Sequence, residues 1–130
     1  MALENLKPYS QMVLRIGMAA VFLWFGINQV FNPGNFIGYL PEFIFSSGYA
    51  NAFVYANGIF EIVLGSMLAA GLFTRVAAFL LSIHLIAIII ELGYGETFIR
   101  DAGLMIATFS VFIGGEDKWC LDYKMKSAKK

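Results

Sequence analysis

Four long apolar stretches constrain this chain more than any other feature of its sequence. They cover roughly residues 11–31, 52–73, 76–92 and 98–114. Each is close to the ~17–25 residues that an α-helix needs to span a ~30 Å hydrocarbon layer. We therefore predict membrane-spanning helices at about residues 11–31, 52–73, 75–93 and 98–115.

The composition favours a membrane protein over a soluble one. Hydrophobic residues make up 59% of the 130 residues and charged residues only 14%, whereas soluble domains average about 45–50% apolar and about 25% charged residues. A soluble chain of this length could not bury so much apolar surface. No linker or low-complexity segment divides the chain. We predict a single domain over residues 1–130, an all-α integral membrane four-helix bundle that crosses the cell membrane several times.

The positive charges predict the orientation of the helices. Of the nine Lys and Arg residues, only Arg100 lies in a connection on the outer side; the other eight lie at the N-terminal end, in the short connection at residues 71–75 or in the C-terminal tail. Basic residues accumulate on the cytoplasmic side of membrane proteins. Both termini are therefore expected in the cytoplasm, where the Lys-rich tail would meet the anionic headgroups of the lipid bilayer.

Several classes of function are disfavoured. The formal net charge is zero, and the basic residues form no stripe interleaved with aromatic residues, so nucleic-acid binding is unsupported. One His, the single Cys120 and scattered carboxylates do not supply the three or four converging ligands of a metal centre, so we predict no metal site. A lone cysteine also excludes a dithiol mechanism within this chain.

Two ionisable residues fall deep in the predicted membrane. Counting ~1.5 Å per residue from the cytoplasmic helix ends places Glu61 about 18 Å and His84 about 13 Å into the layer. They lie on neighbouring helices joined by a tight turn, so a direct or water-bridged contact is feasible. Ionisable groups inside a membrane are costly and are candidates for function. We predict Glu61 and His84 as the catalytic pair, with Glu61 either protonated at neutral pH or paired with a cation.

A second polar group is expected nearer the outer surface. The same count places Asn28, Gln29, Asn57 and Glu91 about 24 Å in, close to Arg100 and Asp101 at the start of the last helix. Such a group would line a path to Glu61 for a quinone-like molecule, another small polar molecule or a proton. The alternative is that the amides only link helices by hydrogen bonds, and that Arg100 and Asp101 only border the interface.

The connections between the helices carry their own signals. The tight turn at residues 71–75 predicts an antiparallel hairpin, with Gly71 as the C-cap of one helix and Thr74 as the N-cap of the next. The loop at residues 32–51 contains prolines and many aromatic residues, which predicts a short amphipathic segment in the outer interface. Small residues within the spans are expected to pack the helices closely.

The order of several motifs resembles the DoxX-like family of small four-helix membrane proteins. Arg15 opens the first helix, Gly26 is followed by Asn32 and Pro33, EIVLGSMLAAGLFTR covers residues 61–75, and GGEDKWCLD covers residues 114–122. The resemblance extends over nearly the whole chain. It departs where family members often have a lysine after the glycine of helix one, here replaced by Asn28 and Gln29. It departs again where the usual tryptophan-serine ending is Trp119 and Cys120.

The resemblance implies a redox-linked role. The family is named after small subunits of a thiosulfate:quinone oxidoreductase, and other relatives work with membrane redox complexes or in membrane-protein assembly. This chain would then be an accessory, quinone-linked subunit of a membrane oxidoreductase, with Arg15, Glu61 and Arg75 at matching positions. The resulting candidates for ligand binding are Arg15, Asn28, Asn57, Arg75, Glu91 and Asp101.

Other points stay open at this level. The cofactor is not determined, with quinone as the candidate, and the expected partner is another membrane or redox protein. A homo-oligomer is compatible with the sequence, and whether the isolated chain is an enzyme is undecided. The alternative function is a non-catalytic assembly factor or chaperone for membrane proteins, in which the polar residues are structural.

Overall fold

The protein is all-helical in a computed structural model that describes residues 4–36, 42–92, 95–115 and 117–128. No β-strand occurs within these ranges, which confirms the predicted all-α class. The long helices are α1 (Lys7–Phe31), α3 (Ala50–Ala70), α4 (Thr74–Leu92) and α5 (Glu96–Gly114). Shorter elements are the 3-10 helices η1 (Glu4–Leu6) and η2 (Pro33–Asn35) and the helices α2 (Glu42–Phe45) and α6 (Leu121–Ala128). Helix α1 begins earlier and α3 ends earlier than predicted, and α6 was not predicted.

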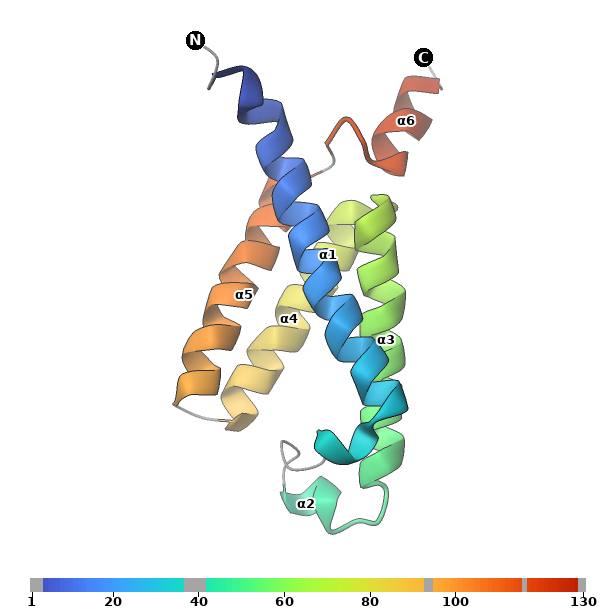
Figure 1. Ribbon diagram of the computed structural model, residues 1–130, viewed down its shortest axis with the longest axis vertical. Helices are drawn as coiled ribbons and strands as arrows, with labels where there is room; N and C mark the ends of the chain where they lie inside the picture. The colour runs from blue at the N-terminus through green and yellow to red at the C-terminus, as the bar shows by residue number, and fades with distance from the viewer. Residues whose placement is uncertain (1–3, 37–41, 93–94, 116, 129–130) are drawn as a thin grey trace.

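The long helices run alternately in opposite directions, as Figure 1 shows. Helix α1 packs mainly on α3, and α4 packs mainly on α5, while further contacts join α3 to α4 and α1 to α5. The start of α1, the α3–α4 turn and α6 lie at one end, called the α6 end below, and α2 lies at the opposite α2 end. The apolar core between the helices includes Met18, Phe22, Leu64, Leu68, Ala77 and Leu81.

Helices α1 and α3 approach closely because glycines face each other where they meet. A Cβ atom on Gly26 would lie 2.8 Å from the carbonyl oxygen of Gly58, and one on Gly58 would lie 2.9 Å from the carbonyl oxygen of Gly26. Real Cβ atoms do not come so close to other atoms. Any side chain at these positions would push the two helices apart, which is the packing role expected for small residues between apolar helices.

The α3–α4 turn is held by a residue from the distant C-terminal helix. Gly71 ends α3 in the left-handed region at φ 74°, as predicted for a C-cap. Thr74, however, is the first residue of α4 and not its N-cap. The Asp122 carboxylate of α6 accepts hydrogen bonds from the backbone N–H groups of Phe73 at 2.8 Å and Thr74 at 2.7 Å. The predicted Thr74 cap is therefore wrong, because a carboxylate 48 residues away satisfies these donors.

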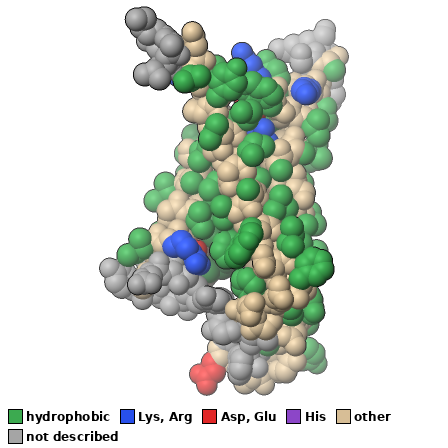
Figure 2. Space-filling model, in the orientation of Figure 1, with side chains coloured by type: hydrophobic (Ala, Val, Ile, Leu, Met, Phe, Trp, Pro, Cys, Tyr) green, Lys and Arg blue, Asp and Glu red, His purple; other side chains and the backbone are tan. Residues whose placement is uncertain are grey.

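The surface between the two ends is apolar. Helices α1 and α3 are long and apolar enough to cross a membrane, and α4 contains a shorter apolar segment, Thr74–Ile90. Only 28% of the most apolar part of α1 and 33% of that of α3 are buried inside the structure. Most of this apolar surface therefore faces outward, unlike that of a core helix in a soluble protein. Figure 2 shows hydrophobic side chains along the length of one face, with Lys and Arg gathered mainly near the α6 end.

Candidate functional site

A cavity of about 150 Å³ lies among the four long helices, in the half of the structure toward the α2 end. Four phenylalanines, Phe22, Phe25, Phe36 and Phe53, line it together with aliphatic side chains. Its polar lining consists of Gln29, Asn57, Glu61, Arg100 and Asp101. An apolar cavity of about this volume accommodates a benzene ring in other proteins. The site therefore has the size and the walls for one ring-shaped group.

Glu61 of α3 forms part of the cavity wall and is only 4% exposed. Its Oε2 atom accepts a hydrogen bond from Gln29 Nε2 at 2.9 Å, and its Oε1 atom lies 3.0 Å from His84 Nε2. Asn57, one turn earlier on α3, donates to Oε1 at 3.5 Å. Three helices thus hold this carboxyl group. The tautomer of His84 decides the direction of this hydrogen bond: a protonated Nε2 donates to Glu61, and an unprotonated Nε2 accepts from a protonated Glu61.

His84 reaches Glu61 from outside the cavity. It is not among the cavity-lining residues, its side chain is 15% exposed, and its ring centroid lies 5.0 Å from that of Phe60. The structure brings together the two ionisable residues that the sequence places at similar depth. Glu61 stands between the cavity on one side and the imidazole on the other.

Gln29 extends this network, whereas its neighbour Asn28 does not. The Oε1 atom of Gln29 accepts a hydrogen bond from Asn57 Nδ2 at 2.6 Å. Asn28 instead donates to the carbonyl oxygen of Trp24 within its own helix, at 2.7 Å, and does not line the cavity. Counting residues treats the two amides alike because it gives depth along the helix and not direction around it. The residues of α1 that line the cavity could have been predicted from one signal, the i, i+3, i+7 spacing of Phe22, Phe25 and Gln29, which places them on one face of the helix.

Helix α5 supplies a second polar wall. Asp101, a predicted ligand-binding residue, lines the cavity and is buried, and its Oδ1 atom accepts a hydrogen bond from Arg100 Nε at 3.1 Å. Arg100 also lines the cavity, with its guanidinium carbon 5.6 Å from the centroid of the Phe25 ring. The interpretation that these two residues only border the membrane interface did not predict that both line the cavity. Glu91, predicted to lie on the same path, belongs to α4, but its side chain lies outside the part of the structure that is described.

Arg15 lies in a separate cluster toward the α6 end and does not line the cavity. Its Nε and Nη2 atoms donate to the two carboxylate oxygens of Asp117 at 2.8 and 3.3 Å, with the two side chains 2% and 3% exposed. Its Nη1 atom donates to the carbonyl oxygens of Leu68 and Ala69 at 2.8 and 2.6 Å. This guanidinium ties α1 to the last turn of α3 and to the α5–α6 connection, and it donates to carbonyls at the end of α3, where a helix leaves such groups without partners in its own next turn.

The carboxylates of this end are held ionised. Burial by itself raises the pKa of Asp117, but the hydrogen bonds from Arg15 and from the Trp119 backbone N–H, with the Arg15 charge, bring its pKa below the usual value. The pKa of Asp122 is likewise lowered, because the hydrogen bonds from Thr74 and Phe73 outweigh the effect of burial. Arg75 lines a shallow groove with Asp122, away from the cavity. Ligand binding by Arg15 and Arg75 stays a prediction that the cavity does not support.

A comparison with protein families matches residues 10–94 to DoxX. This segment includes α3, α4 and most of α1, and with them Gln29, Glu61 and His84. The chain belongs to the DoxX family. The match confirms the resemblance inferred from the motifs, and together with the apolar surfaces of α1 and α3 it identifies a DoxX family membrane protein.

The DoxX chain is also similar to a protein of Haemophilus influenzae that is named only as uncharacterized. The two are 31% identical over 115 residues, which is 88% of this chain and 76% of the relative. No solved structure matches this chain. Because the DoxX match ends at residue 94, the wall formed by Arg100 and Asp101 lies beyond the matched segment.

Proposed function

We propose that this DoxX protein is an accessory, quinone-binding subunit of a membrane redox system. The observation that carries the proposal is the cavity of about 150 Å³, in which aromatic side chains line the walls together with the buried Gln29 and Glu61, and Glu61 contacts His84 behind the wall. A quinone headgroup is an apolar ring with polar carbonyl oxygens, so its faces suit aromatic walls and its oxygens need hydrogen-bond donors. The quinone link that the family resemblance implies supports the same ligand class.

The side chains present fit such a ring. The amide nitrogen of Gln29 has two N–H groups and uses one on Glu61, which leaves a donor for a ring oxygen. Glu61 can hold a proton at the edge of the cavity and exchange it with His84 Nε2, 3.0 Å away. A bound quinone supplies a two-electron, two-proton acceptor, and in this proposal a membrane or redox partner protein provides the electrons.

The proposal places the protein in the cell membrane as a multi-pass four-helix bundle with both termini in the cytoplasm. The apolar surfaces of α1 and α3, and the basic residues near the α6 end, support this placement. The cavity then opens in the outer half of the bilayer. A quinone with an apolar tail would enter it from the lipid.

Labelling of single cysteines tests this topology. In a Cys120→Ser background, we expect Lys126→Cys to react with a membrane-impermeant maleimide in inverted vesicles only, and Ser46→Cys in right-side-out vesicles only. The reason is that three membrane crossings, α3, α4 and α5, separate the two positions along the chain. Both native side chains are exposed, so access within the protein is not limiting. Labelling of both positions from the same side would contradict the proposal that α3, α4 and α5 all cross the membrane.

Quinone binding is tested by calorimetric titration of the protein in lipid nanodiscs with a short-chain 1,4-benzoquinone. Empty nanodiscs correct for partition of the quinone into lipid. We expect saturable binding that Glu61→Gln weakens by up to about tenfold, since a hydrogen bond between neutral groups contributes about 0.5–1.5 kcal/mol. Glu42→Gln, the same chemical change at an exposed carboxylate of α2, should leave the affinity unchanged.

Two results would contradict this function. Absence of saturable binding would remove quinone as the ligand, and binding equally strong in Glu61→Gln would place it elsewhere on the protein. If the protein instead forms a stable complex with another membrane protein, whose assembly depends on it and whose redox state does not, the assembly-factor function is supported. Cross-linking in native membranes, combined with quinone titration of the purified complex, separates these outcomes.

A further inference from the structure

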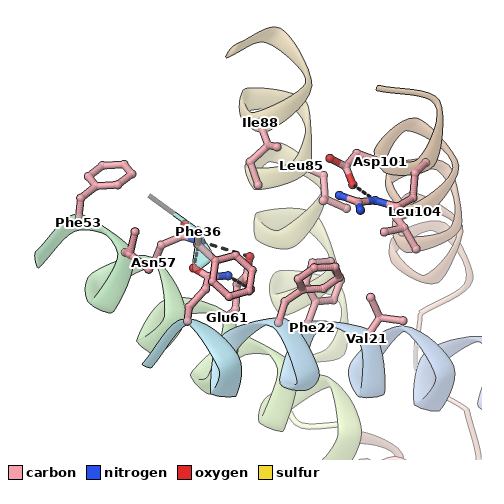
Figure 3. Close-up of a pocket in the computed structure, with 14 residues that line it drawn as sticks. Val21, Phe22, Phe36, Phe53, Asn57, Glu61, Leu85, Ile88, Asp101 and Leu104 are labelled. Carbon is pink, nitrogen blue, oxygen red and sulfur yellow. Dashed lines mark hydrogen bonds and ion pairs between the residues drawn. The ribbon is translucent and has the colours of Figure 1, made fainter. Parts of the chain in front are cut away.

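The cavity has polar groups on two sides, and the proposed function uses only one of them. Figure 3 shows Glu61 and Asn57 on one side and Asp101 on the other, with Phe22 and Leu85 between them. The first side comes from α1 and α3 and the second from α5. With about 150 Å³ between these walls, a single ring would contact both of them.

Arg100 is positioned by two neighbours. Its Nε atom donates to Asp101 Oδ1 at 3.1 Å, and its guanidinium lies over the Phe25 ring at 5.6 Å from the centroid. Asp101 is itself buried, so the carboxylate is a fixed anchor, and the aromatic face adds a favourable cation–π contact. Within the described part of the chain, the hydrogen bonds of this guanidinium end at Asp101.

No described residue accepts from the Nη donors of Arg100, so these donors can reach a ligand. A guanidinium carries five N–H groups in a planar fork, and Asp101 takes one of them. The side chain of Arg100 is 51% exposed, so it lies at the opening of the cavity and not in its depth. A hydrogen bond from such a cation to an oxygen acceptor is stronger than one from a neutral donor.

We infer that Arg100 binds a second oxygen of the ring ligand, opposite the oxygen bound at the Gln29–Glu61 wall, so that the site selects rings with two opposed oxygens. This inference rests on the proposed function and narrows its ligand to the 1,4-quinone class. A ring with one oxygen can satisfy one wall only. Arg100 is thus a specificity-determining residue, and Asp101 is a positioning residue that acts through it.

The test compares two ligands that share an alkyl tail, a 1,4-benzoquinone and a 4-alkylphenol. Titrated into nanodiscs, wild-type protein should bind the quinone about tenfold more tightly than the phenol, and Arg100→Gln should lose about that factor for the quinone while changing phenol binding less than about twofold. Glu61→Gln should weaken both ligands. Lys118→Gln removes an exposed cation outside the cavity and should change neither affinity.

A second pair of variants separates the missing guanidinium from the anion that it leaves behind. Arg100→Gln with Asp101→Asn removes both charges, and we expect it to bind the quinone as weakly as Arg100→Gln alone. Arg100→Lys should recover part of the affinity, because it keeps the charge without the planar fork. Unfolding midpoints of all variants identify any loss that is due to misfolding.

The possible results separate this inference from the proposed function on which it rests. Quinone binding that depends on Glu61 and not on Arg100 overturns the two-oxygen selection and leaves the proposed function intact. Recovery of wild-type affinity in the double variant also overturns it, since the loss would then come from an unpaired Asp101. Failure of wild-type protein to bind any quinone overturns both.

Discussion

Asp117→Asn should lower the free energy of unfolding by about 3–5 kcal/mol, the usual cost of breaking a buried ion pair by removing one partner. The Arg15 guanidinium, 2% exposed, would lose its only carboxylate within the described part of the chain. Its hydrogen bonds to the last carbonyls of α3 do not neutralise a full charge. Unfolding in mixed SDS micelles, followed by circular dichroism, measures the change.

Glu42→Gln is the matched control, because it converts an exposed carboxylate to an amide and should change stability by less than about 0.5 kcal/mol. Replacing both partners, as Arg15→Met with Asp117→Leu, should recover much of the loss, since no buried charge then remains unpaired. A loss below about 1 kcal/mol in Asp117→Asn would show that the pair is not the anchor of the α6 end.

The lowered pKa of Asp117 predicts how the stability of the folded protein depends on pH. Its pKa is lower in the folded protein than the ordinary value of 3.8, so the folded state favours the ionised form. The resulting stabilisation is fully present above pH values near 3.8 and is lost as the pH falls through the lower folded-state pKa. As the pH falls below about 3.8, the free energy of unfolding of Asp117→Asn should therefore decrease less steeply than that of wild type.

Gly26→Ala and Gly17→Ala should change stability in opposite directions, although both replace a glycine within α1. The new methyl group at Gly26 would lie 2.8 Å from the carbonyl oxygen of Gly58 and 3.0 Å from the backbone nitrogen of Ile62, both on α3, so the helices would have to move apart. Overpacking of this kind costs about 1–3 kcal/mol. At Gly17 nothing lies within 4 Å, so alanine should stabilise the helix by about 0.5–1 kcal/mol.

The measurement is again unfolding in mixed micelles, with both variants compared in one titration series. Close approach of α1 and α3 also positions Gln29 against Asn57 and Glu61, so Gly26→Ala should weaken quinone binding as well as folding. Equal effects of the two substitutions would contradict the close α1–α3 contact.

Depth along the helices is the part of the site that could be predicted before the structure. Each residue adds a known rise, so Glu61 and His84 come out at similar depth on neighbouring helices, and the structure has them 3.0 Å apart. Rotation about each helix was not predictable in the same way. Asn28 and Gln29 differ by one residue, but only Gln29 lines the cavity, because helix packing decides which face turns inward.

The sequence by itself determined that this protein is all-helical, rich in membrane-capable apolar surface and a member of the DoxX family, because helix length, hydropathy and motif order are local properties. Only the tertiary structure decided which polar groups meet. Arg15 finds Asp117 across 102 residues, Asp122 caps α4 from a distant helix, and Arg100 joins the cavity opposite Glu61. Such pairings depend on how the helices pack in three dimensions, where the cost of burying an unpaired charge selects the partner.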